Sequence, residues 1–300
     1  MSGSGLVALL VRALAWPGLY LLLLLGRQQL ERWLIARFQR RRAGPLCLPA
    51  LGGAGRSSTI ARSLAAAVGL LAGMAIPLAP DTVAAGQRLP GHVLGEMDAS
   101  LLYALAVGWI GAGLAAWDGG AGVLQPGHLL PWRIAGASLL RALPALPIAL
   151  SLILSAGALY RQASALSVPA MIAAQGGWQG MRWLAFLQPL ALVLWLACTS
   201  PLPPAAQGQQ ALAWQVQALN WTLVTVALFF GGWQGPLTER YAGLGFLYTA
   251  AKAGLVTFVW TWVRANWPAA ALLAQARAVW RVVMPLAALN LALTAAIMLI

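Results

Sequence analysis

The sequence predicts an all-α fold, a polytopic transmembrane helix bundle that forms a single integral membrane domain over residues 1–300. Of the 300 residues, 61% are hydrophobic and only 8% are charged. A soluble domain carries about 25% charged residues, so this chain has too few charges to cover a water-facing surface. The net charge of +13 does not indicate nucleic-acid binding, because the arginines flank apolar segments, where membrane topology accounts for them.

About eight apolar segments are long enough, or nearly so, to cross a bilayer, which takes roughly 17–25 mostly apolar residues. The expected spans cover residues 6–25, 63–80, 100–117, 134–157, 182–199, 215–233, 242–263 and 281–300. We expect the first span to remain in the mature protein as a helix. Arg12 interrupts its apolar run, and no small-residue cleavage site is evident.

The arginines of the connections indicate how the chain is oriented. The first connection carries eight arginines, the third one and the seventh three, against four in all the even-numbered connections. Short connections that are rich in basic residues stay in the cytoplasm. We therefore expect the odd-numbered connections in the cytoplasm and both termini on the non-cytoplasmic side, in a multi-pass protein of the inner (plasma) membrane.

Prolines and glycines predict how some of the spans bend and pack. Pro144 and Pro147 are expected to kink the fourth span, because proline lacks a backbone donor and its ring clashes with the preceding turn. Gly69 and Gly73 form a GxxxG face in the second span, which suits close packing against a neighbouring helix.

Three ionisable residues, Arg12, Arg141 and Lys252, fall inside the predicted spans. A charge at such depth is costly and usually faces the protein interior or water. We expect Arg12 and Arg141 to snorkel toward the interface along bent helices. Lys252 lies deep in the seventh span, well before Arg264, and snorkels less easily. A structural role and a functional or partner-facing role are equally open for it.

The densest motif lies near the carboxyl end of the chain. It comprises the turn 231–236, then Lys252 inside an apolar helix, then an expected loop closing on residues 277–285. The residues at fixed spacing are Gly231, Gly232, Trp233, Pro236, Lys252, Arg264, Ala265, Pro268, Arg277, Trp280, Arg281 and Pro285. Their order resembles that of the quinone-proximal membrane subunit of NADH-quinone oxidoreductase, the H subunit of respiratory complex I.

The amino-terminal part agrees with this resemblance. Glu31-Arg32, followed by Arg37-Phe38 and Arg41, is similar to the signature that follows the first helix in the H-subunit family. The resemblance in topology extends over essentially the whole chain, with its motifs concentrated at the two ends.

The resemblance implies a surface that docks the peripheral arm and frames the mouth of the quinone tunnel. Its candidate residues are Glu31, Arg32, Arg37, Phe38, Arg41, Arg133, Arg264 and Arg277, with Lys252 and Arg141 as charges inside the membrane. Contacts with lipid phosphates are an equally open interpretation of the single arginines. On this resemblance the chain would help to form the quinone site and would join the peripheral redox arm to the membrane arm of a proton-translocating NADH:quinone oxidoreductase.

No catalytic constellation, phosphate-binding loop or metal-ligand spacing is visible in the sequence. We therefore expect the chain to bind no cofactor and to catalyse no redox step alone. The resemblance implies that quinone is the substrate of the assembled complex and that flavin and iron–sulfur clusters are held by partner proteins. It also implies that the partners are peripheral quinone-site subunits and antiporter-like membrane subunits, together with membrane lipids.

The chain departs from the H-subunit pattern where that family carries glutamates. Ala142 stands at one such place, beside Arg141, and Cys198, Gln207 and Gln209 stand at others. Because none of these side chains is a carboxylic acid, we expect proton relay to be impaired. Two other functions stay open: a non-pumping scaffold protein in a membrane-bound hydrogenase or other complex-I-like assembly, and a stand-alone transporter.

Overall fold

The chain folds into helices that pack around one central helix. The computed structural model describes residues 3–39, 59–79, 82–84, 87–89, 99–121, 130–160, 166–176, 182–200, 212–238, 240–241, 243–266 and 272–299, with the backbone alone at the end turns of several helices. Within these ranges nearly all residues are helical. The all-α prediction is confirmed.

The helices vary widely in length. Their bounds are α1 (Gly3–Phe38), α2 (Thr59–Met74), α3 (Ser100–Ala121), α4 (Leu130–Ala142), α5 (Ala145–Tyr160), α6 (Val168–Ala174), α7 (Leu184–Leu187), α8 (Pro189–Thr199), α9 (Leu212–Phe229), α10 (Gly243–Asn266), α11 (Leu272–Ala278), the π-helical η1 (Val279–Val283) and α12 (Met284–Leu299). A short antiparallel hairpin, β1 (Thr82–Ala84) with β2 (Gln87–Leu89), precedes α3.

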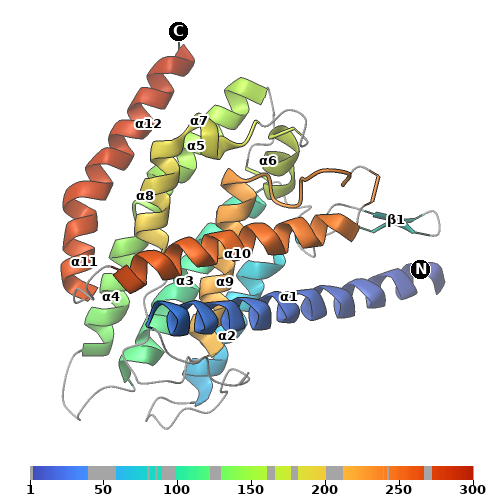
Figure 1. Cartoon of the computed structure of the whole chain (residues 1–300), viewed down its shortest axis with the longest axis horizontal. Coiled ribbons are helices and arrows are strands. Elements are labelled where there is room, and N and C mark those ends of the chain that lie inside the picture. Colours follow the sequence, from blue (N-terminus) through green and yellow to red (C-terminus); the bar gives the residue numbers. More distant parts are fainter. Residues whose placement is uncertain are drawn as a thin grey trace.

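Helix α9 is the centre of the bundle. Almost every residue from Ala213 to Phe229 is buried, and α9 packs against α1, α2, α3 and α10. Figure 1 shows α9 roughly upright in the middle, with α1 and α10 side by side across it and running in the same direction. A helix that is mostly apolar on every side and carries no charge is stable when other helices enclose it, which is why α9 occupies this position.

Four described helices are long and apolar enough to cross a membrane: residues 135–157, 212–229, 243–266 and 274–298. Three shorter apolar helices, Ser63–Met74, Ser100–Ala115 and Pro189–Thr199, fall within the predicted second, third and fifth spans. The prediction of a transmembrane helix bundle is thereby confirmed in the length and apolar composition of these helices. The number of about eight spans and the side of each terminus stay predictions.

Prolines break two of the predicted spans. The chain turns at residues 143–144 between α4 and α5, so the kink expected at Pro144 is confirmed. A second break, at Gln188 between α7 and α8, was not predicted. Pro189 is the first residue of α8, a position where its missing N–H removes no helical hydrogen bond.

The prediction of a loop that closes on residues 277–285 is wrong. These residues lie in one continuous helical stretch made of α11, η1 and α12. The Met284 N–H donates to the Val279 carbonyl, five residues back. Because Pro285 has no N–H and its ring needs room, a wider turn just before it lets the helix continue.

Glycines let α2 approach its neighbours closely. A β-carbon at Gly69 would lie 2.6 Å from Val216 Cγ1, and one at Gly73 would lie 2.8 Å from Tyr20 Cε2. The Asn220 amide fills the same junction, accepting from the Tyr20 hydroxyl at 2.6 Å and donating to the Gly69 carbonyl. The close-packing face predicted from the GxxxG motif is confirmed.

Candidate functional site

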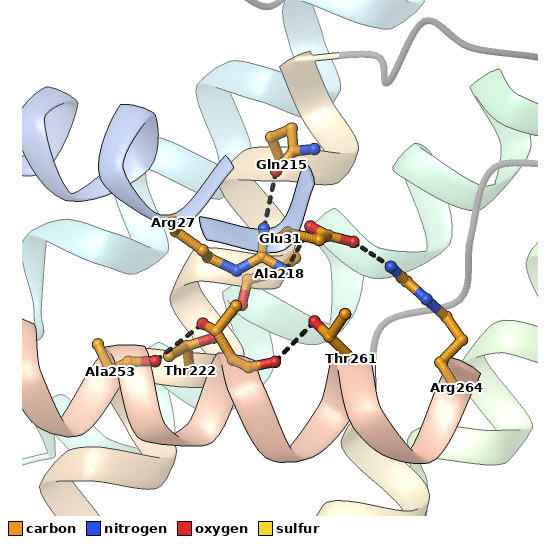
Figure 2. Close-up of polar contacts among 9 residues, drawn as sticks. Arg27, Glu31, Gln215, Ala218, Thr222, Ala253, Thr261 and Arg264 are labelled. Carbon is orange, nitrogen blue, oxygen red and sulfur yellow. Dashed lines mark hydrogen bonds and ion pairs between the residues drawn. The ribbon is translucent and has the colours of Figure 1, made fainter. Parts of the chain in front are cut away.

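A buried cluster of charges joins α1, α9 and α10 (Figure 2). The Glu31 side chain on α1 is only 1% exposed, and its two carboxylate oxygens face two different arginines. Arg27 Nη2 lies 3.4 Å from one oxygen, one helical turn away on α1. Arg264, near the end of α10, donates to the other oxygen. Glu31 is thus held between two guanidinium groups that are far apart in sequence.

Helix α9 supplies the uncharged part of this cluster. Arg27 Nη1 donates to Gln215 Oε1 at 2.7 Å. The ring of Trp214 faces both cations, with its centroid 5.6 Å from Arg27 Cζ and 6.0 Å from Arg264 Cζ. One carboxylate cannot neutralise two guanidinium groups, so the amide oxygen and the negative face of the indole stabilise the remaining positive charge.

The threonines beneath the cluster are satisfied within their own helices. Thr222 donates to the Ala218 carbonyl on α9, and Thr257 and Thr261 on α10 donate to the carbonyls of Ala253 and Thr257, as Figure 2 shows for this stretch. Since each hydroxyl bonds four residues back, these side chains line the contact between α9 and α10 without leaving an unpaired donor.

Arg27 is the residue of this cluster that sequence reasoning missed. It was assigned to the first connection, which was expected to begin after residue 25. Helix α1 instead continues to Phe38, so that Arg27, Arg32 and Arg37 are helical. The spacing of Arg27 and Glu31, four residues apart, was the signal available, because such pairs face each other on a helix.

A second charged centre lies at the turn before α10. Lys252 Nζ donates to three backbone carbonyls, those of Phe230 at 2.7 Å, Gly232 at 2.9 Å and Gln234. It also lies 4.8 Å from the ring centroid of Trp183. Gly231 and Gly232 have positive φ angles of 67° and 53°, which suit glycine and bring these carbonyls to one side. The lysine ammonium therefore holds the glycine turn together.

The carboxyl-terminal part of the chain, which contains Lys252 and Arg264, matches a known family. A family model described as NADH dehydrogenase covers residues 209–295. Among the most similar relatives is the first of the NADH-quinone oxidoreductase H subunits of Geobacter sulfurreducens. It is 25% identical over 261 residues, which is 73% of this chain and 68% of that protein. This chain is a relative of the NADH-quinone oxidoreductase H subunits.

Other relatives of the same type match shorter stretches. The H subunit of Deinococcus deserti is 29% identical over 147 residues, 39% of this chain and 38% of that protein. The second H subunit of Rhodopseudomonas palustris is 35% identical over 71 residues, 24% of this chain and 22% of its own length. The resemblance to this family stated from the sequence motifs is thereby confirmed, at a modest identity.

Arg141 stands next to one of the departures from the H-subunit pattern. It is 4% exposed and donates to the Ser200 carbonyl, to Ser200 Oγ at 3.3 Å and to Gln275 Oε1 at 3.2 Å. The expectation that Arg141 snorkels is therefore wrong, because neutral acceptors at the end of α8 and on α11 bind its guanidinium inside the protein. Neighbouring Ala142 is also buried. The side chain of Arg12 lies outside the described residues.

The structure brings together only some of the docking residues expected from the family resemblance. Glu31 and Arg264 form the ion pair, whereas Arg32 is half-buried on α1 and Arg37 is exposed. Phe38 packs against Phe258 of α10, with ring centroids 6.3 Å apart. The exposed Arg277 lies on α11. Arg41 and the side chain of Arg133 lie outside the described residues, as do Gln207 and Gln209.

A neutral polar network, also missed, surrounds the break at Gln188. Its amide donates to Ser155 Oγ and, at 3.4 Å, to Thr294 Oγ1, while the Asn290 amide donates to Ser151 Oγ at 3.0 Å. These groups tie α5 and α12 to the α7–α8 junction. Among the described residues, no group of three or more histidines, cysteines or acids is arranged to hold a metal ion.

Proposed function

We propose that this chain is the quinone-proximal membrane subunit of a complex-I-type NADH-quinone oxidoreductase. In this role it acts as a non-redox part of the enzyme, and quinone is the substrate of the assembled complex. One observation carries the proposal. The family match over residues 209–295 includes two residues with defined contacts. Lys252 binds the carbonyls of the glycine turn, and Arg264 forms the ion pair that joins α10 to α1. Flavin and iron–sulfur clusters would sit on partner subunits, and the complex would lie in the inner (plasma) membrane.

The ends of α1 and α10 are the proposed docking surface for the peripheral arm. The two helices run side by side in the same direction (Figure 1), so Arg37 and Arg264 belong to the same end of this pair. The ion pair of Glu31 with Arg264 would keep the two ends in register. The aromatic contact of Phe38 with Phe258 adds an apolar wall that a quinone tail could lie against. Arg32 and the further arginines of the first connection would extend this basic surface.

We also propose that proton relay through this chain is impaired. The buried carboxylate of Glu31 is bound by two arginines, which favour its ionised form over a proton-carrying one. Arg141 places a buried positive charge beside Ala142. A fixed positive charge raises the free energy of a proton that moves past it and of any group that becomes protonated beside it. Neutral partners such as Ser200 and Gln275 hydrogen-bond but cannot ionise to relay a charge.

Purification of the tagged chain from its native membranes in a mild detergent tests the assignment. We expect flavin and iron–sulfur subunits and antiporter-like membrane subunits to co-purify. A nickel hydrogenase pair in their place would assign the chain to a hydrogenase-type assembly, and its purification without any partner would favour a stand-alone transporter. Either result overturns the proposal.

The impaired relay needs a separate measurement in the assembled complex. We expect proton translocation per electron pair in vesicles to be lower than in a complex that carries a conventional H subunit. Substitution Ala142→Glu combined with Arg141→Ala should raise it, whereas Arg141→Ala alone should not, because that variant adds no proton-binding group. Full translocation by the unaltered complex would refute this part of the proposal.

A further inference from the structure

Two arginines one helical turn apart line a hollow on the outside of the bundle. The hollow has a volume of about 460 Å³, and Ala274, Arg277, Ala278, Arg281 and Val282 line it. Both arginines are exposed. The helix that carries them, α11 with η1 and α12, lies at the edge of the molecule in Figure 1. The hollow is separate from the α1–α10 cluster described above.

The two guanidinium groups at this hollow suit an anionic ligand. Residues spaced at i and i+4 lie on the same face of a helix, where two like charges repel each other. An anion bound between Arg277 and Arg281 would attract both guanidinium groups and so offset their mutual repulsion. Guanidinium forks match the oxygens of a phosphate group better than an ammonium does, so the pair favours a phosphate in particular.

The surface below the arginines is apolar and faces outward. Val282, which lines the hollow, begins a series of exposed side chains that continues with Leu286, Leu289, Leu293 and Ile297. Only 17% of the apolar window in residues 274–298 is buried. A helix so long and apolar, and so little covered by its own chain, suits contact with lipid tails.

Trp280 marks the level of the membrane interface beside the hollow. Its indole N–H donates to the Leu140 carbonyl at 2.9 Å, and the side chain is 38% exposed. Tryptophan is enriched at the level of lipid headgroups, where its ring is in an apolar layer and its N–H is hydrogen-bonded. Arg277 and Arg281 flank Trp280 in sequence, which places them at the height of the lipid phosphates.

We propose that this hollow binds an anionic phospholipid. Arg277 and Arg281 would hold its phosphate, and the acyl chains would extend along the exposed apolar side of α12. The proposal needs only the membrane location of the chain and is independent of the oxidoreductase assignment.

Binding of phosphatidylglycerol to the purified protein, full-length and with whatever subunits it retains, tests the proposal. Native mass spectrometry would count retained lipids, and the thermal midpoint would be followed during lipid titration. We expect the variant R277Q/R281Q to bind phosphatidylglycerol about 30-fold more weakly, because each basic residue near an anionic headgroup contributes roughly a factor of five. Phosphatidylcholine with the same acyl chains carries the same phosphate beside a choline cation, so it should bind the unaltered protein more weakly and should lose less affinity in the variant.

A matched control removes the same charge elsewhere. Arg182 and Arg240 are also exposed, and the variant R182Q/R240Q should retain phosphatidylglycerol at the unaltered level. If both variants lost phosphatidylglycerol binding equally, the loss would come from the change in net charge alone, and the proposal would be overturned. Binding of inorganic phosphate as tight as that of the lipid would reassign the hollow to a soluble anion. Unchanged lipid binding with loss of a co-purifying protein from R277Q/R281Q would reassign it to a protein interface.

Discussion

Glu31 and Arg264 are paired across the interface of α1 and α10, although 233 residues separate them in the chain. The pair connects the amino-terminal helix to the carboxyl-terminal segment that matches the family model. Arg27 and Trp214 complete its surroundings, so three helices depend on one carboxylate for their charge balance.

Removal of that carboxylate should destabilise the protein strongly. Substitution Glu31→Gln leaves Arg27 buried without an anion, and breaking a buried pair by removing one partner costs about 3–5 kcal/mol. Arg264→Gln should cost less, about 1 kcal/mol, because its side chain is 24% exposed and Glu31 keeps Arg27. Free energies of unfolding in detergent micelles would measure both. Equal losses in the two variants would contradict this account of the cluster.

The glycine turn before α10 should depend on the Lys252 ammonium. Substitution Lys252→Met leaves three carbonyls without their shared donor, and hydrogen bonds to a charged group contribute roughly 1.5–3 kcal/mol each. We expect a loss of at least about 4 kcal/mol of stability and faster tryptic cleavage after the exposed Arg240. Lys252→Arg should not restore the turn, since a planar guanidinium cannot replace a compact ammonium among these acceptors. Cleavage of Lys252→Met at the unaltered rate would show that the turn holds without the lysine.

Close packing of α2 should make Gly73 intolerant of even one methyl group. A β-carbon there would lie 2.8 Å from Tyr20 Cε2 and 2.9 Å from Asn220 Oδ1, so Gly73→Ala should cost about 1–3 kcal/mol through overpacking. Gly157→Ala is the matched control, because nothing lies within 4 Å of its β-carbon position. The control should be neutral or stabilising by up to about 1 kcal/mol. The thermal midpoints of unfolding of the two variants would test this difference, and equal midpoints for Gly73→Ala and Gly157→Ala would contradict the prediction.

The neutral network at the α7–α8 break should behave as a cooperative unit. Gln188→Leu and Asn290→Leu each remove contacts to Ser151 or to each other. Interhelical hydrogen bonds in membrane proteins average about 0.6 kcal/mol, so each variant should lose roughly 1–2 kcal/mol. A double-mutant cycle should give a coupling energy of at least about 0.5 kcal/mol. Simple additivity would mean that the two amides act independently.

Part of this fold was predictable because its signals are local. Pro144 falls in the middle of an apolar run, where a proline favours a break in the helix. Gly69 and Gly73 lie on one face of α2 and leave room there for any packing partner. The apolar neighbours of Lys252 likewise showed that it lies inside a helical span, although its role stayed open. Such features follow from one residue type and its immediate neighbours, so no tertiary contact is needed to foresee them.

Other features could not be foreseen because they depend on distant contacts. Helix α1 continues past its apolar run to Phe38 because α9 and α10 cover Arg27 and Glu31. Hydropathy alone placed these residues in a connection. Arg141 was expected to reach the interface, but Ser200 and Gln275 bind it inside the protein. The pattern of a single segment does not contain the acceptors that other segments provide.

Composition, apolar length and motif spacing are properties of the chain alone, and they were enough to predict a helical membrane protein related to the H subunits of NADH-quinone oxidoreductase. Only the tertiary structure decided which buried charges are paired. The free energy of a buried ion depends on the groups within a few ångströms of it, and folding brings those groups from distant parts of the chain. That is why Glu31 lies with Arg27 and Arg264, while Arg277 and Arg281 remain on the outer surface.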